Sequence, residues 1–366
     1  YSSLNPNEFE KFVRILRNKE NIDKKILSNL SKHIGVKKYF LTKKEVEYRN
    51  DVKKVWVAKK RIKKNKLITK NDLIMKRANE KVMNIEFENL IGTKALKNIK
   101  KDSIVRMSDI NYKVSALIIA RSHSKRLPKK IIKNFYGSTA LEYIIKRLKR
   151  SKKINRIILC TTKKGIDDIL CRIAKKNSIN YVRGPEEDVL SRMLLACKKN
   201  NEIIIRVTGD DILVDSKYID NAINYHVKNN LEYCSIDKLP SGTEVELYNS
   251  SLLFELHKTL KDKNSTEYLT NMIKDNSQDF NFLDLPVKKK HQKKIRLTLD
   301  TYKDYQVIKL FLGEMKRKKK FFNFNMDDLV YFFRKRKDVL NINNQVKQKK
   351  MPIHYSSKIL WNRLIS

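Results

Sequence analysis

The sequence predicts an α/β protein in which a mostly parallel sheet follows a small β domain. From Val114 onwards, apolar runs typical of buried strands alternate with amphipathic helix patterns. This alternation indicates a parallel sheet with helices on both faces. Upstream, a repeated segment within residues 53–111 predicts a pseudo-symmetric β domain. We therefore expect three parts: residues 1–52, a helix and linker; residues 53–112, the β domain; and residues 113–366, the α/β domain.

The first part contains one clear helix pattern, over residues 7–18. Its apolar side chains recur at i, i+3, i+4 and i+7, the spacing of one helix face: Phe9, Phe12, Val13 and Leu16. We expect it to be the last helix of a larger unit. A polar, lysine-rich connector follows to about residue 53.

The β domain carries an internal repeat at a constant offset of 37 residues. The segment IKKNKLITKNDL, Ile62 to Leu73, matches IKKDSIVRMSDI, Ile99 to Ile110. Each copy predicts a turn, a short apolar strand and a second turn that is capped by Asp72 or Asp109. Two copies of one unit indicate pseudo-symmetry.

The α/β domain follows as strands and helices in alternation. We expect strands over 114–120, 156–162, 180–182, 203–207 and 294–300, and helices over 140–150, 165–177, 186–199 and from Tyr302. The helix near 186 has Pro185 at its predicted first position, with Glu186 and Glu187 at the positive end of its dipole. This pattern leaves the roles of Arg183 and Arg192 open.

Composition limits the classes of function. The formal charge is +42 over 366 residues, but the lysines are spread along the whole chain and accompany many Asn and Ile residues. Adenine- and thymine-rich codons explain this pattern, so we expect non-specific attraction to polyanions and no specific nucleic-acid partner. No apolar run approaches the roughly 20 residues that a membrane span needs. The four separated cysteines match no zinc or disulfide pattern, which favours free thiols and a cytoplasmic location.

The first strand-to-helix connection is strongly basic. ARSHSKRLPKK, residues 120–130, places Arg121, Arg126, Lys129 and Lys130 directly after the first strand. This is the end of a Rossmann-like sheet where phosphates bind, and such cations can hold a triphosphate. The segment is not a Walker loop, because GxxxxGK[ST] is absent.

Two predicted strands end in carboxylates. IIIRVTGDD ends at Asp210 and Asp211, and RLTLD ends at Asp300. Gly and Asp are also ordinary turn residues, so a plain turn is one interpretation of the first segment. The other is a magnesium site, because Mg²⁺ often takes one or two carboxylates together with phosphate oxygens. We expect Asp210 and Asp300 to lie close enough to share one ion.

Together these segments resemble the cytidylyltransferase-like family of spore-coat polysaccharide biosynthesis, which is related to CMP-sialate and CMP-ketodeoxyoctonate synthetases. The resemblance covers roughly residues 114–350 and includes ARSHSKRLPKK, RGPEEDVLSR, RVTGDDILVDSKYID, PSGTEVELY, STEYLT and RLTLDT, in the family's order. It implies a Rossmann-like nucleotide-diphospho-sugar transferase fold. By this resemblance Arg121, Arg126 and Lys130 bind CTP, Asp210 and Asp300 hold Mg²⁺, and Arg121, Lys130 and Asp210 form the catalytic set.

Five positions depart from the family pattern. Lys129 replaces a glycine in the basic loop, and Asp211 and Ile212 follow Asp210 in place of a small residue and proline. Glu244 occupies a position where the family has aspartate, and Tyr268 one where it has histidine. A side chain at 129 can hinder close approach of the backbone to phosphate.

The β domain resembles the antifreeze-like (SAF) domain that ends N-acetylneuraminate synthases. VWVAKKRIKKNKLITKNDLIMKR and LIGTKALKNIKKDSIV carry this resemblance, and SLNPNEFEKFVR resembles the last barrel helix of the same enzymes. The family's arginine that reaches a neighbouring subunit's barrel corresponds to Arg77, where Ala78-Asn79 replaces the usual Pro-Gly. The resemblance implies contact with a synthase barrel.

The function that these observations favour is a Mg²⁺-dependent nucleotidyltransferase that activates an acidic, sialic-acid-like sugar with CTP. A homodimer is compatible with it. Two alternatives remain at this stage: a glycosyltransferase on the same fold, and a catalytically impaired scaffold that partners a synthase.

Overall fold

The structure is a computed structural model that describes residues 5–17, 44–45, 48, 52–77, 85, 87–260, 266, 269–275 and 280–346. The chain divides into two compact units, Tyr1–Lys53 and Lys54–Ser366. In the first unit, helix α1 spans Pro6–Arg17, where the sequence predicts a helix. Asn5 and Glu8 cap its start, since each backbone N–H donates to the other's side chain. The predicted connector lies mostly outside the described residues.

The second unit begins with the repeat, and the two copies are related by a pseudo-twofold arrangement. Strand β1 (Lys54–Ala58) pairs antiparallel with β2 (Leu73–Arg77). At the centre, Ile62 and Ile99 exchange two backbone hydrogen bonds of 2.9 Å. These two residues are separated by the 37-residue offset, so each copy presents the same position to the other. The predicted pseudo-symmetry is confirmed.

Both copies end in a short 3₁₀ helix that an aspartate caps. Helix η2 (Lys70–Asp72) has its Asp72 carboxylate 3.0 Å from the Thr69 backbone nitrogen. Helix η3 (Met107–Asp109) repeats this contact from Arg106 to Asp109 at 2.9 Å. The predicted caps are therefore present. Most of the short strands expected here are single β-bridges.

The α/β part is built on a seven-stranded sheet with the order β11-β9-β10-β8-β3-β6-β7. Its strands are β3 (Lys113–Ile119), β6 (Arg156–Thr162), β7 (Asn180–Gly184), β8 (Glu202–Thr208), β9 (Tyr233–Ser235), β10 (Glu246–Asn249) and β11 (Phe282–Asp284). Only β10 runs antiparallel to its neighbours, so the prediction of a mostly parallel sheet is confirmed. A separate hairpin pairs β4 (Asn134–Phe135) with β5 (Ser138–Thr139).

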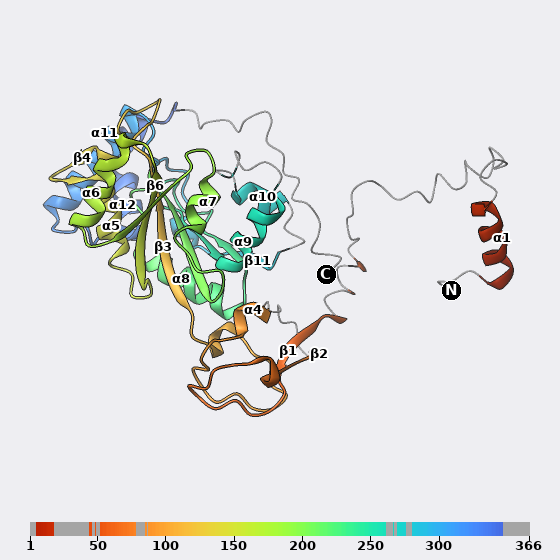
Figure 1. Cartoon of the computed structure of the whole chain (residues 1–366). Coiled ribbons are helices and arrows are strands. Elements are labelled where there is room, and N and C mark those ends of the chain that lie inside the picture. Colours follow the sequence, from red (N-terminus) through yellow and green to blue (C-terminus); the bar gives the residue numbers. More distant parts are fainter. Residues whose placement is uncertain are drawn as a thin grey trace. The chain divides into compact units, whose positions relative to one another are not determined.

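Helices cover both faces of this sheet (Figure 1). One face packs against α5 (Ala140–Leu148), α6 (Asp168–Lys176), α8 (Ser216–Lys228), α11 (Tyr302–Arg317) and α12 (Met326–Lys335). The other packs against α7 (Val189–Leu194), α9 (Ser250–Thr259) and α10 (Leu269–Asp275). Two short helices, α4 (Phe87–Leu90) and α13 (Lys337–Asn341), contribute Leu90 and Val339 to the first cluster.

Strand β8 is buried on both faces, because alternate side chains of its apolar run enter different hydrophobic clusters. Ile203 and Ile205 point into the first hydrophobic cluster, and Ile204 points into the second. All three are fully buried. Each such side chain contributes about 1.5–3 kcal/mol by leaving water. This two-sided burial fixes the strand whose end carries Asp210.

The β domain and the sheet share one hydrophobic cluster. It runs from Met107 and Ile110 to Val114 and Leu231. The backbone N–H of Met107 also donates to Asn230 at 2.9 Å.

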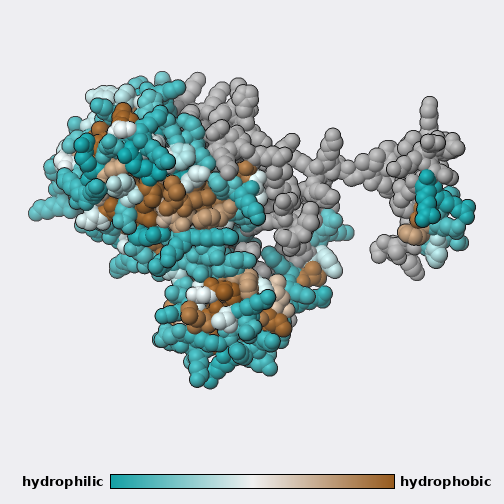
Figure 2. All heavy atoms as spheres, viewed as in Figure 1, coloured by the Kyte–Doolittle hydropathy of each residue, from teal (hydrophilic) through white to brown (hydrophobic). Residues whose placement is uncertain are grey.

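Hydrophilic residues cover most of the face of the molecule drawn in Figure 2, as the even spread of lysine along the sequence suggests.

One predicted helix, over 186–199, is shorter than expected, and one predicted strand, over 294–300, is wrong. Helix α7 begins at Val189, three residues later than expected, because Asp188 caps it by accepting from the Ser191 N–H at 2.9 Å. Residues 294–300 form no regular strand: Arg296 makes a single parallel bridge to Ser241. The segment is instead fixed by bonds to loops on either side.

The prediction of free cysteine thiols is confirmed. Cys160, Cys171 and Cys234 are buried free thiols, and Cys197 is a half-buried one. Among the residues that the structure describes, no helix combines the length and apolarity that a membrane crossing requires.

Candidate active site

A cluster of opposite charges lies at the carboxyl edge of the sheet, between the loops that follow β3 and β8. Lys130 begins the 3₁₀ helix η4 (Lys130–Ile132) at the end of the basic loop. Its ammonium nitrogen lies 2.8 Å from Asp210 Oδ2 and 3.0 Å from Asp300 Oδ1. The two carboxylates, 90 positions apart in sequence, therefore converge on one cation, as expected. We refer to these three residues as the Lys130 cluster.

Close backbone packing positions Asp210. The preceding Gly209 donates its N–H to Ile119 at 2.9 Å, which joins β8 to β3 beyond the end of the ladder. A Cβ at Gly209 would meet the Ala120 Cβ at 3.0 Å and a methyl of Ile131 at 3.1 Å. Glycine thus lets the two loops approach, and the backbone oxygen of Asp210 accepts from Leu299 at 2.9 Å.

Asp300 is held by three cations rather than by a strand. Arg126 contacts its Oδ2 at 2.8 Å and Arg296 contacts the same oxygen at 3.1 Å, while Lys130 binds Oδ1. Gly242, at φ +92°, lies against the backbone of the 296–300 segment, where a Cβ would be 2.3 Å from the Leu297 carbonyl carbon. Only glycine fits this approach.

Arg121 lies apart from the Lys130 cluster. Its guanidinium pairs with Glu186 at 3.0 Å and Glu187 at 3.6 Å, and Lys164 also pairs with Glu186. The two glutamates therefore do not act as first-turn residues of α7, because that helix starts beyond them. The structure brings together Arg126 and the Lys130 cluster, and leaves Arg121 on the neighbouring side of the same edge.

Sequence reasoning missed the residue that fixes the Arg121 loop. Asp167, buried, accepts from the Ser122 backbone N–H at 2.6 Å and from the Thr162 hydroxyl. It thereby ties the loop after β3 to the loop after β6. Spacing gives no signal for this contact, since 45 positions separate Asp167 from Ser122.

Charges in the cluster shift one another's ionisation. Burial alone would lower the pKa of Lys130, but Asp210 and Asp300 outweigh it and raise that pKa. Burial opposes ionisation of Asp210 as well, yet the Lys130 ammonium lowers the pKa of this carboxyl. Lys130 and Asp210 are thus both charged at neutral pH.

A second pair of carboxyls nearby behaves in the opposite way. Burial and then the charge of Asp210 raise the pKa of Asp211 to about 8. Burial and then Asp211 raise the pKa of Glu244 to about 8. Both residues occupy departures from the family pattern. Among the described residues, neither has an ammonium partner like that of Asp210, so each retains a proton more readily.

Lys129 adopts the backbone conformation that a glycine would take. Its φ and ψ are 55° and 31°, in the left-handed region, and its side chain is exposed. The substitution thus keeps the turn of the loop at the cost of local strain. Tyr268, another departure, lies outside the described residues.

Among the described residues, no group of three or more His, Cys, Asp or Glu side chains could hold a metal ion. Asp210 and Asp300 nevertheless each place one hard carboxylate oxygen against the same group, the Lys130 ammonium. Such a pair fits Mg²⁺, which commonly completes its shell with water and phosphate oxygens.

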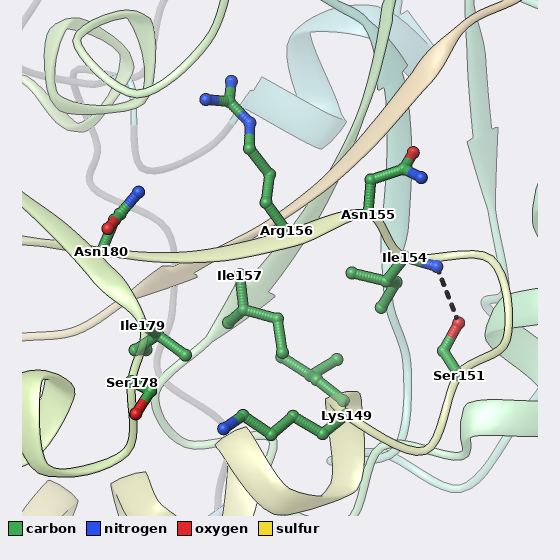
Figure 3. A pocket seen from close by; sticks show the side chains of 10 residues that line it. Lys149, Ser151, Ile154, Asn155, Arg156, Ile157, Ser178, Ile179 and Asn180 are labelled. Atoms are coloured by element: carbon green, nitrogen blue, oxygen red, sulfur yellow. Dashed lines mark hydrogen bonds between the residues drawn. The ribbon is translucent and has the colours of Figure 1, made fainter.

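A hollow of about 320 Å³ lies at the other end of the parallel strands (Figure 3). Arg156 and Ile157 at the start of β6, and Asn180 at the start of β7, line it together with Lys149 and Ser151. Open α/β sheets bind ligands at the carboxyl ends of their strands. We therefore assign chemistry to the Lys130 cluster and not to this hollow.

Comparison with known families agrees with the geometry. The cytidylyltransferase profile matches residues 115–345, which includes every residue of the Lys130 cluster. The chain belongs to the cytidylyltransferase family. The SAF domain profile matches residues 53–111, the pseudo-symmetric β domain.

Individual relatives of this cytidylyltransferase align over the same region. An uncharacterised protein of Methanocaldococcus jannaschii is 34% identical over 239 residues, which are 65% of this chain and 97% of that protein. The spore coat polysaccharide biosynthesis protein SpsF of Bacillus subtilis is 31% identical over 212 residues, 56% of this chain and 86% of SpsF. A solved cytidylyltransferase from Leptospira borgpetersenii is 31% identical with a TM-score of 0.59, covering 65% of this chain and all of that one.

Proposed function

We propose that this cytidylyltransferase uses CTP and Mg²⁺ to activate an acidic sugar for surface polysaccharide synthesis. The observation that carries the proposal is the convergence of Asp210 and Asp300 on the ammonium of Lys130. A hydroxyl oxygen of the sugar forms a bond to the α-phosphorus of CTP, and the bond from that phosphorus to the β-phosphate oxygen breaks. Pyrophosphate leaves, the hydroxyl proton passes to solvent, and a CMP-sugar results.

The residues of the site act by positioning and by charge, as is usual in phosphoryl transfer. Asp210 and Asp300 would hold Mg²⁺, which supplies charge neutralisation at the triphosphate when bound. The Lys130 ammonium and the Arg126 guanidinium, both directed at these carboxylates, would then bind the triphosphate. Arg121 would join them after exchanging its Glu186 partner for phosphate oxygens.

Two observations support the choice of sugar. The SAF domain precedes the cytidylyltransferase domain in one chain, and the domain resembles the end of synthases that make acidic keto sugars. The related SpsF is named for spore coat polysaccharide biosynthesis. We infer that the SAF domain contacts a synthase barrel, with Arg77 at the exposed end of β2 as the reaching residue. A cytoplasmic homodimer is part of the same proposal.

The experiment is a pyrophosphate-release assay with CTP, Mg²⁺ and a panel of acidic and neutral sugars. We expect release with a 2-keto-3-deoxy acid sugar, and loss of at least 100-fold in turnover for Asp210→Asn and Asp300→Asn, the size of effect seen when a transition-state charge partner is removed. Asp237→Asn, on the surface beyond β9, is the matched control. Binding of CTP without pyrophosphate release for any sugar would support a scaffold function instead.

A further inference from the structure

The two longest uninterrupted runs of basic residues in the sequence meet on one face of the α/β part. Residues 316–320 read KRKKK, and residues 334–337 read RKRK. The first run covers the end of α11 and the turn after it, and the second joins the end of α12 to the start of α13. The ring centroid of Tyr331 lies 5.6 Å from the Lys318 ammonium and 5.5 Å from the Arg334 guanidinium carbon. We call the nine basic residues and Tyr331 the α11–α12 basic face.

This face carries an excess of positive charge that the neighbouring acids do not balance. All nine basic residues are exposed. Three carboxylates pair with members of the face, those of Glu314, Asp328 and Asp338. Nine cations against three carboxylates leave six positive charges in excess. Five of the cations form no ion pair with any residue that the structure describes: Lys316, Lys319, Arg334, Lys335 and Lys337.

A buried arginine holds the turn that carries the first run. Arg147 is 1% exposed, and its guanidinium donates to the backbone oxygens of Phe322 at 2.9 Å and Phe324 at 2.8 Å. The same group stacks on the Phe324 ring at 3.9 Å, and the Tyr143 hydroxyl donates to the backbone oxygen of Phe321. The run therefore follows a helix into a fixed turn. Its cations are preorganised, so an anionic partner loses less affinity to ordering of the chain.

The surroundings of Tyr331 indicate which anionic partner fits. Two classes of partner present many phosphates, nucleic acids and bilayers that contain anionic lipids. Proteins that bind single-stranded nucleic acid combine cations with aromatic faces on which the bases stack. Here the Tyr331 ring, 48% exposed, already has Lys318 and Arg334 against it. A tyrosine among lysines, apolar in its ring and polar at its tip, is instead suited to the headgroup region of a bilayer.

We propose that the α11–α12 basic face docks the protein on the anionic surface of a lipid bilayer. Lipid phosphates bind its unpaired cations, and Tyr331 lies at the depth of the headgroups. Clusters of about four to eight Lys and Arg residues recognise anionic lipids in this way. The inference goes beyond the proposed function and does not depend on it, because none of these residues belongs to the Lys130 cluster.

The test is cosedimentation of the full chain with vesicles of phosphatidylcholine, with and without phosphatidylglycerol, at about 0.15 M salt to screen diffuse attraction. We expect binding only to the vesicles that contain phosphatidylglycerol. Each lysine near such a surface contributes roughly five-fold in affinity. The triple variant Lys319→Gln, Lys335→Gln, Lys337→Gln should therefore bind roughly 100-fold more weakly.

The matched control removes the same charge from the β domain, by Lys63→Gln, Lys64→Gln and Lys100→Gln, at three exposed lysines. It should bind the vesicles nearly as wild type does. An equal loss in the control would assign the binding to total charge and overturn the proposal.

Two further measurements close the remaining alternatives. The Tm of the triple variant should equal that of wild type; if it falls, the pair Lys335→Gln and Lys337→Gln decides in its place, with an expected loss of roughly 25-fold. Single-stranded poly(U) is the second ligand. Wild type that binds poly(U) through this face and leaves the anionic vesicles unbound would assign the face to nucleic acid, and wild type that does not distinguish the two kinds of vesicle would also overturn the proposal.

Discussion

Replacing Lys130 by methionine should lower the free energy of unfolding, because the ammonium offsets the repulsion between two nearby carboxylates. The substitution keeps the apolar stem and removes the ammonium between Asp210 and Asp300. The Lys130 side chain is 18% exposed, and the two carboxylates are 24% and 10% exposed. Because these groups are largely desolvated, Asp210 would then lose the ammonium that it pairs with, and the two carboxylates would repel each other. Asp300 would keep only Arg126 and Arg296 as partners.

The size of the effect follows from the two contacts. Removing one member of a buried ion pair costs about 3–5 kcal/mol. The remaining carboxylates lie no further apart than the sum of their 2.8 and 3.0 Å distances to the ammonium. At an effective dielectric constant of about 20 their repulsion amounts to roughly 3 kcal/mol. We expect Lys130→Met to lose about 3 kcal/mol of unfolding free energy at pH 7 in EDTA.

Mg²⁺ should restore most of this loss. In wild type the ammonium competes with the ion for both carboxylates, whereas in Lys130→Met that competitor is gone and the remaining cations, Arg126 and Arg296, contact Asp300 alone. Urea unfolding in EDTA and in millimolar Mg²⁺ measures both effects, with Lys129→Met as the control because that lysine is exposed and forms no ion pair within the described residues. A Lys130→Met protein as stable as wild type in EDTA, or indifferent to Mg²⁺, would refute the argument.

Three other predictions concern the loop, a buried histidine and the domain boundary. Lys129→Gly should change CTP affinity little and reduce its salt dependence, because one cation is lost; a large gain at low and high salt alike, by calorimetry, would mean that the lysine obstructs the triphosphate. Burial lowers the pKa of His226 to about 4, so its contribution is complete above about pH 6.5 and is lost as pH falls towards 4. Urea unfolding should show a loss of about 2–3 kcal/mol between pH 7 and 4.5 that His226→Gln largely removes; an unchanged slope in the variant would assign the loss elsewhere. A chain beginning at Lys113 should stay soluble and unfold cooperatively, with a lower Tm because the cluster that it shares with the β domain becomes exposed; insoluble protein or non-cooperative unfolding would mean that the α/β region does not fold without the β domain.

The sequence was sufficient for the sheet and for the convergence of the two acids. Ile203–Ile205 is apolar on both faces, which only a doubly covered strand explains, and the strand's direction puts Asp210 at the carboxyl edge. Asp300 lies at the same edge, but no regular strand positions it. Its segment has a single bridge at Arg296, and cations and Gly242 position it. The predicted proximity was therefore right although the predicted strand was not.

Contacts between loops could not be predicted from the residues alone. Arg121 and Glu186 are separated by 65 positions, and a glutamate near a helix start has an adequate local explanation in the helix dipole. Only the later start of α7, at Val189, frees that glutamate for an ion pair.

The pairing of Ile62 with Ile99 has a consequence for how this domain tolerates change. Each position is the other's hydrogen-bonding partner, and both are almost fully buried. A substitution in one copy therefore perturbs the same contact as its counterpart 37 residues later. A systematic substitution scan of the domain should yield two cost profiles that superimpose at this offset. Where the profiles diverge, one copy is under a constraint that folding does not impose, such as contact with another protein.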